Sequence, residues 1–192
     1  MTDWFDAITR ALIPPETPPV PPAPNHDHLL DLIGDGSRAD AAVLMAIRDL
    51  PEPSMVFTLR REDLAHHAGQ VSFPGGRTDH GDSGAIETAL RESREEIALD
   101  PDAVEPLGFI DCLETISGFC VTPVVARLAG DAVLVPQPDE VAKLFEVPLG
   151  FLLDPATCGN SISTRAASGG RCMNTWVSSR ASGARRRRCW ST

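Results

Sequence analysis

Three glutamates in one short acidic segment have the type and spacing that metal binding needs. Glu92, Glu95 and Glu96 stand three and four residues apart, so on a helix they share one side, one turn above another. Carboxylates gathered in this way repel one another unless a cation compensates, and Mg²⁺ characteristically bridges carboxylates to substrate phosphates. The segment therefore predicts a divalent-cation site. The alternative is a solvated acidic face crossed by salt bridges, and Arg91 is placed to form one with Glu95, four residues later.

A pair of glycines upstream favours the metal site over the solvated face. The stretch from Ser72 to Arg77 reads as a strand that ends in a turn at Gly75 and Gly76. Glycines let backbone N–H groups approach an anion without a side chain in the way. A glycine turn followed by an acidic helix is therefore suited to holding a pyrophosphate between amides and metal ions.

The acidic segment belongs to the clearest predicted helix, Ala85 to Leu99. Its apolar stripe lies on the side that the glutamates avoid, at Ile86, Ala89, Leu90, Ser93 and Ile97. Periodicity and turn residues predict further helices over 3–13 and 40–50, and strands over 55–59, 70–73, 104–110 and 119–128, followed by a strand and a short helix within 141–153. Helices and strands alternate irregularly, so we expect an α/β domain with a mixed β-sheet between helices.

The chain of 192 residues divides into three parts by composition. Residues 1–37 are expected to form an N-terminal helix and an arm that has seven prolines between Pro14 and Pro24. Residues 38–154 are the candidate catalytic domain. Residues 155–192 hold seven arginines and no acid, which indicates either a disordered basic tail or a reading-frame change near Pro155.

Charge and cysteine content exclude several classes of protein. The net charge is −10, and all 27 acidic residues lie at or before Asp154, so we expect no nucleic-acid partner. No apolar run is long enough to cross a membrane, and the first residues lack a secretory leader. Five cysteines without a C-x-x-C pair are typical of a reducing environment. We therefore expect a cytoplasmic protein that acts on a small molecule; the oligomeric state is not predicted.

The stretch from Arg91 to Leu99 resembles the signature of the Nudix hydrolases. That signature ends in Arg-Glu, an apolar residue, any residue, Glu-Glu, any residue, Gly and an apolar residue. Ser93 and Ala98 depart from it, at the apolar and glycine positions. If position 98 is left-handed, alanine is strained there by roughly 1 kcal/mol. Upstream, Ser83 stands where the signature has glutamate. The glycine of the signature is found one position early in this chain, at Gly76.

With its glycine shifted in this way, the sequence resembles the coenzyme A pyrophosphatase branch of that family. The similarity covers about half the chain, roughly residues 55–150. It is carried by Thr58-Leu59-Arg60, Leu64, His67 to Arg77, Asp82 and Thr88-Ala89-Leu90-Arg91-Glu92. It implies a Nudix α/β/α sandwich. It also implies Mg²⁺- or Mn²⁺-dependent hydrolysis of the pyrophosphate bond of coenzyme A or its derivatives, giving 4′-phosphopantetheine and adenosine 3′,5′-bisphosphate.

The resemblance assigns roles to residues. The implied catalytic residues are Arg91, Glu92, Glu95 and Glu96, the three glutamates also being the metal ligands. The implied substrate-binding residues are Arg60, His67, Gly75, Gly76 and Arg77, although either arginine could instead be a surface ion pair. The general base is left open between a helix glutamate and Glu140, and His66 and His67 are further candidates for positioning.

Two other functions remain open at this point. The first is hydrolysis of another nucleoside diphosphate derivative, such as ADP-ribose or a dinucleotide. The second is an inactive Nudix-like binding module, which the atypical residues 155–192 would favour and the intact Arg-Glu-x-x-Glu-Glu set would not.

Overall fold

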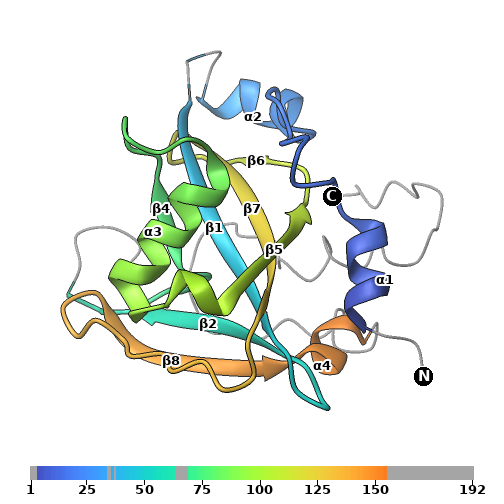
Figure 1. Ribbon diagram of the computed structural model, residues 1–192. Helices are drawn as coiled ribbons and strands as arrows, with labels where there is room; N and C mark the ends of the chain where they lie inside the picture. Colours follow the sequence, from blue (N-terminus) through green and yellow to red (C-terminus); the bar gives the residue numbers. More distant parts are fainter. Residues whose placement is uncertain (1–3, 34–35, 37, 64–68, 155–192) are drawn as a thin grey trace.

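The structure, a computed structural model, describes residues 4–33, 36, 38–63 and 69–154 (Figure 1). Its elements in chain order are α1 (Trp4–Ala11), α2 (His26–Ile33), β1 (Ala39–Arg48), β2 (Ser54–Arg60), β3 (Val71–Ser72), β4 (Gly75–Arg77), α3 (Ala85–Ile97), a 3₁₀ turn (Pro101–Ala103), β5 (Val104–Phe109), β6 (Leu113–Glu114), β7 (Phe119–Leu128), β8 (Val141–Pro148) and α4 (Leu149–Leu153). The predictions for His66, His67 and residues 155–192 fall outside the described residues.

All eight strands join one mixed sheet around β1. The main strand order is β3-β2-β1-β7-β5, with β4 on β1, β6 on β7 and β8 on β2. The pairing of β1 with β7 is parallel along its whole length, whereas β1 pairs with β2 and β4 in the antiparallel sense. The mixed sheet that the sequence predicted is confirmed.

The two faces of the sheet carry separate apolar layers. On one face, Leu44 of β1 packs with Ala89 and Ile97 of α3. On the opposite face, Met45 packs with Phe5 of α1 and Leu149 of α4. In Figure 1, α3 lies over β1 and β4, away from α1 and α4. Successive residues of a strand point to opposite faces, so β1 is buried on both sides and the fold is the α/β/α sandwich expected of a Nudix domain.

The predicted helix over residues 40–50 is wrong, because this segment forms the central strand β1. Its run from Ala41 to Ile47 is almost continuously apolar. A strand covered on both faces has this pattern, which periodicity alone does not distinguish from a buried helix. The alanines favour a helix locally, but pairing with β2, β4 and β7 overrides that preference.

The two glycines were predicted to end a strand in a turn, but they begin another strand instead. Gly75 and Gly76 pair with Val43 and Ala42 of β1 as part of β4. A Cβ on Gly75 would lie 2.6 Å from the Cα of Val43 and overlap the backbone of Ala42. Glycine at this position therefore allows a close approach between two strands, and this approach brings β4 next to α3.

The N-terminal arm is held to the domain at two places. Ile13 forms a β-bridge with Phe109 of β5. Farther along, His26 at the start of α2, a helix that the sequence analysis did not predict, contacts the buried carboxylate of Glu114 through Nδ1 at 2.8 Å. None of the described helices is long and apolar enough to span a bilayer.

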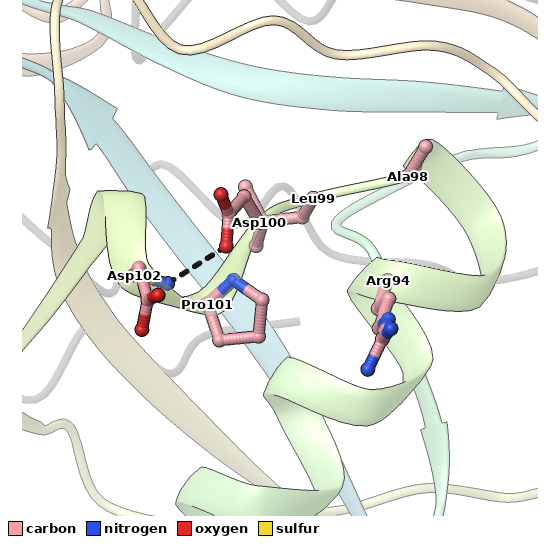
Figure 2. A pocket seen from close by; sticks show the side chains of 6 residues that line it. All are labelled: Arg94, Ala98, Leu99, Asp100, Pro101 and Asp102. Carbon is pink, nitrogen blue, oxygen red and sulfur yellow. Dashed lines mark hydrogen bonds between the residues drawn. The ribbon is translucent and has the colours of Figure 1, made fainter.

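The predicted helix over residues 85–99 is confirmed as α3, which ends at Ile97. Ala98 follows in the left-handed conformation at φ 51° and ψ 34°, and it is the one described non-glycine residue with a positive φ. Figure 2 shows the chain turning there toward Asp100, whose Oδ1 accepts from the Asp102 amide at 3.1 Å. The missing signature glycine is thus a strained alanine in a left-handed position.

Replacing Ala98 with glycine should therefore stabilise the protein. Ala98→Gly removes a strain of roughly 1 kcal/mol. The greater conformational freedom of glycine in the unfolded chain offsets part of this gain in stability. We expect the free energy of unfolding in urea to rise by about 0.5 kcal/mol. Ala85→Gly, at the start of the same helix, should lower it. A loss of stability in both variants would contradict the assigned strain.

Candidate active site

One side of helix α3 is packed against β1 and β4. Ser93, which replaces an apolar signature residue, is fully buried. Its hydroxyl donates to the carbonyl of Ala89, one turn earlier, at 2.6 Å. The helix backbone thus satisfies the buried hydroxyl, and the departure from the signature leaves the packing of α3 intact.

Glu96 is buried against β2 and β4 instead of facing solvent. Its side chain is 4% exposed, so the prediction that all three glutamates avoid the buried side of α3 is wrong for this residue. Oε1 accepts from Nη1 of Arg60 at 2.9 Å, and Oε2 accepts from the backbone N–H of Gly75 at 3.1 Å. Burial raises the pKa of Glu96 to about 7, against the opposing effects of the Gly75 amide and Arg60.

Glu92 lies one turn earlier and occupies the space that a side chain at Gly76 would need. A Cβ on Gly76 would overlap the carboxylate of Glu92. Partial burial raises the pKa of Glu92, while Arg91 opposes that rise. Glu95 differs from both, because its side chain is 61% exposed. The glycine strand thus lies against two of the three glutamates, and the third faces solvent.

Arg91 ties the glutamates to the loop before α3. Its guanidinium donates two hydrogen bonds to Asp82, from Nε to Oδ1 and from Nη2 to Oδ2, both at 3.0 Å. Nη1 also donates to Glu92 at 2.9 Å. The predicted pairing with Glu95 is present but is the longest of these contacts, at 3.5 Å. Arg91 therefore fixes the carboxylate of Glu92 against the end of β4.

The remaining candidate residues lie around these acids. Arg77 is exposed at the end of β4, and its carbonyl accepts from Nη2 of Arg91 at 2.9 Å. Glu140 lies on the other side, with Oε2 at 4.0 Å from Nη2 of Arg60. The segment that leads to it is held on α3, because the backbone N–H of Gln137 donates to the carbonyl of Glu96 at 2.8 Å. His67 is not among the described residues.

The donor chemistry fits a hard divalent cation, although the carboxylates are engaged by arginines as they stand. Within the described part of the chain, no three His, Cys, Asp or Glu side chains form a ready metal-binding group. Glu92 and Glu96 nevertheless offer oxygen ligands beside a glycine strand that leaves them room. A buried carboxylate such as Glu96 needs positive charge nearby to remain ionised, and a cation meets that need.

Two open hollows flank these residues without including the three glutamates. One lies at the end of α3, where Figure 2 shows the residues Arg94, Ala98, Leu99, Asp100, Pro101 and Asp102. The other is lined by Arg61, Glu62, Asp63, Pro138, Val141 and Ala142, next to Arg60 and Glu140 in the sequence. Side-chain chemistry therefore identifies the candidate site more clearly than surface shape does.

Comparison with known proteins settles the family of this chain. Residues 38–155 match the model of the NUDIX domain. The chain belongs to the Nudix family. Nudix hydrolases generally use divalent metal ions, which agrees with the carboxylate chemistry of α3.

Curated Nudix relatives are similar over the middle of the chain. "Uncharacterized Nudix hydrolase NudL" of Pectobacterium atrosepticum is 51% identical over 109 residues, which is 57% of each chain. The protein of the same name from Escherichia coli K12 is 45% identical over 113 residues, 59% of each chain. The chain thus aligns with less than two thirds of the length of these Nudix relatives.

A solved Nudix structure supports the same fold. The Nudix hydrolase RenU of M. smegmatis matches with a TM-score of 0.50 and 23% identity, covering 59% of this chain and 72% of that one. At this identity the similarity concerns the fold alone.

No role was predicted for Asp82 from its place in the sequence, and the contact between Gly76 and Glu92 was not predicted either. The Nudix signature has glutamate at position 83, where this chain has serine. The structure shows that the neighbouring Asp82 supplies the carboxylate that pairs with Arg91. The sequence did contain a signal for this pair. Asp82 is an acidic residue one position before the signature glutamate and nine residues before the signature arginine, Arg91.

Asp82→Asn should destabilise the protein in a pH-dependent manner. Hydrogen bonds from the Arg91 guanidinium, the Asp79 backbone amide and the Thr88 hydroxyl hold the pKa of Asp82 well below its usual range. A depressed carboxyl pKa stabilises the fold fully above the unfolded value, near 3.9, and this contribution declines below that value until pH has passed through the lower pKa of the folded state. We expect unfolding in urea at pH 7 to show a loss of roughly 1–3 kcal/mol, and a smaller loss near pH 3.

The exposed Asp131 provides the control for this experiment. Asp131→Asn should change the free energy of unfolding little at either pH. An Asp82→Asn effect of equal size at both pH values would show that the charge on Asp82 is not what stabilises the site.

Proposed function

We propose that this protein hydrolyses the pyrophosphate bond of coenzyme A or its derivatives with the help of Mg²⁺ or Mn²⁺, giving 4′-phosphopantetheine and adenosine 3′,5′-bisphosphate. The observation that carries the proposal is the buried carboxylate of Glu96 in contact with the glycine strand, at 3.1 Å from the Gly75 amide. The proposed metal ligands of α3 and the glycine strand β4 thus lie side by side. The motif residues similar to the coenzyme A branch supply the substrate class.

Within this proposal, Glu92, Glu95 and Glu96 are the metal ligands. A divalent cation, when bound there, would supply the positive charge that two bridged phosphates require and would lower the pKa of a bound water. Arg91 is a positioning residue. Its guanidinium is held by Asp82 and donates a hydrogen bond to Glu92, which keeps that carboxylate in place. Fixed ligands reduce the reorganisation that the reaction would otherwise need.

The proposed substrate contacts surround the acids. Gly75 and Gly76 offer backbone next to α3, and Arg60 and Arg77 offer guanidinium groups that suit phosphate oxygens. His67 completes the proposed set by resemblance. The protein's cytoplasmic setting, predicted from cysteine usage, belongs to the same proposal.

The general base remains open between two positions. A helix glutamate is one candidate, and the exposed Glu95 is the one that solvent reaches most easily. Glu140 is the other, because its side chain is 52% exposed and lies 4.0 Å from Arg60. A base must reach the attacking water within hydrogen-bonding distance, and both positions are open to water.

Glu96→Gln tests the metal-ligand assignment. The amide keeps the shape of the side chain but removes the charge that would hold a cation, so turnover of coenzyme A should fall by about 100-fold or more. Product release is measured by chromatography in Mn²⁺, and circular dichroism checks the fold. Glu105→Gln, at an exposed position of the outer strand β5, should keep full turnover. Unchanged turnover in Glu96→Gln would defeat the assignment.

A substrate panel separates the proposed activity from its alternatives. Coenzyme A, ADP-ribose and a dinucleotide are each incubated with and without Mn²⁺. Metal-dependent release of adenosine 3′,5′-bisphosphate from coenzyme A is the expected result. Cleavage of ADP-ribose or the dinucleotide alone would indicate another Nudix substrate, and binding without turnover would indicate a binding module.

A further inference from the structure

Arg60 is the last residue of β2, and its guanidinium pairs with the most deeply buried acid of the site. Nη1 donates to Oε1 of Glu96 at 2.9 Å. The other oxygen of Glu96 accepts from the Gly75 amide. Both oxygens are therefore engaged by donors of the chain itself, and a cation that binds Glu96 has to compete with one of them.

Of these two donors, the arginine is the one that can leave. The Gly75 amide is part of β4, which is paired with the central strand, whereas Arg60 is a long side chain that remains 25% exposed. A guanidinium and a divalent cation at one carboxylate also repel each other, and arginine does not lose its proton in proteins. The arginine must therefore move if a cation takes its place.

The rest of the guanidinium is poorly satisfied where it lies. Nε is buried and has no hydrogen-bond partner among the described residues, and such an orphan donor is unfavourable. Nη2 lies 4.0 Å from Oε2 of Glu140, whose side chain is 52% exposed. Arg60 thus has one close bond to break at Glu96 and a second carboxylate nearby to receive it.

We propose that Arg60 is an internal counter-ion for Glu96, which a divalent cation displaces toward Glu140. Arg60 balances the charge of the buried carboxylate before the cation arrives, and it lowers the apparent affinity for the cation because it competes for the same oxygen. Once displaced, its guanidinium is free to contact an anionic substrate. The inference rests on the proposed function, because it takes Glu96 to be a metal ligand.

Arg60→Met tests this competition when it is compared with Arg61→Met. Arg61 is the adjacent residue and carries the same charge, but it pairs with Asp63 and with the carbonyl of Pro138. Mn²⁺ affinity is measured by calorimetry near pH 8 for the wild type and both variants. We expect Arg60→Met to bind Mn²⁺ about tenfold more tightly than the wild type and Arg61→Met to remain within about twofold.

A second readout is the thermal stability of the metal-free protein. Removing the counter-ion leaves Glu96 buried without a positive partner. In the presence of EDTA, Arg60→Met should therefore melt at a lower temperature than the wild type and Arg61→Met, and Mn²⁺ should raise its melting temperature by more than it raises theirs.

The possible results distinguish this inference from the proposed function. If the wild type binds Mn²⁺ and Glu96→Gln weakens that binding, but Arg60→Met binds no more tightly than the wild type, the counter-ion role is overturned and the metal site stands. If the wild type binds no Mn²⁺, the proposed metal site and the inference both fail.

If Arg60→Met does not fold, the wild-type protein decides the question. The Nε–H signal of Arg60 in ¹⁵N spectra, assigned through Arg60→Lys, should shift as diamagnetic Mg²⁺ is added and should saturate with the binding isotherm. A signal that stays in place while Mg²⁺ binds would overturn the displacement.

Discussion

The site depends on giving one carboxylate hydrogen-bonding partners in a place that water barely reaches. Glu96 is buried between α3 and the sheet, and a buried charge without partners is strongly unfavourable. Its two partners, the Gly75 amide and Arg60, come from β4 and β2, which are held by pairing with β1. The same close approach lets Glu92 lie against Gly76. The sheet, the glycines and the acidic helix therefore form one connected arrangement.

Much of the framework follows from local pattern. Helix α3 and strands β2, β5 and β7 lie within one or two residues of their predicted ranges, because an amphipathic helix and short β-branched strands carry clear periodic signals. Strand β1 was missed because its alanine-rich apolar run is equally compatible with a buried helix, and only its partners far along the chain decide between them. The Gly75–Gly76 strand was missed for a related reason, since its partner is β1 itself.

The candidate site was predictable in composition but not in arrangement. Spacing brought Glu92, Glu95 and Glu96 onto one helix, and the left-handed Ala98 was anticipated from the signature glycine. A helical wheel treats solvent as uniform outside the apolar stripe, whereas β4 and Arg60 cover one edge of α3. Glu96 is therefore buried and Glu95 exposed, although they are neighbours in the sequence. The fork between Arg91 and Asp82 likewise depends on how the loop before α3 folds back.

The most direct test of the metal site is to locate a paramagnetic ion by NMR. Mn²⁺ broadens the amide signals of residues close to it, so substoichiometric additions to ¹⁵N-labelled protein should first erase the signals of Gly75, Gly76, Glu92 and Glu96. Signals from α1, which packs on the opposite face of the sheet, such as that of Ala7, should persist. Broadening that begins on another acidic surface, while the signals around Glu96 remain sharp, would contradict the account.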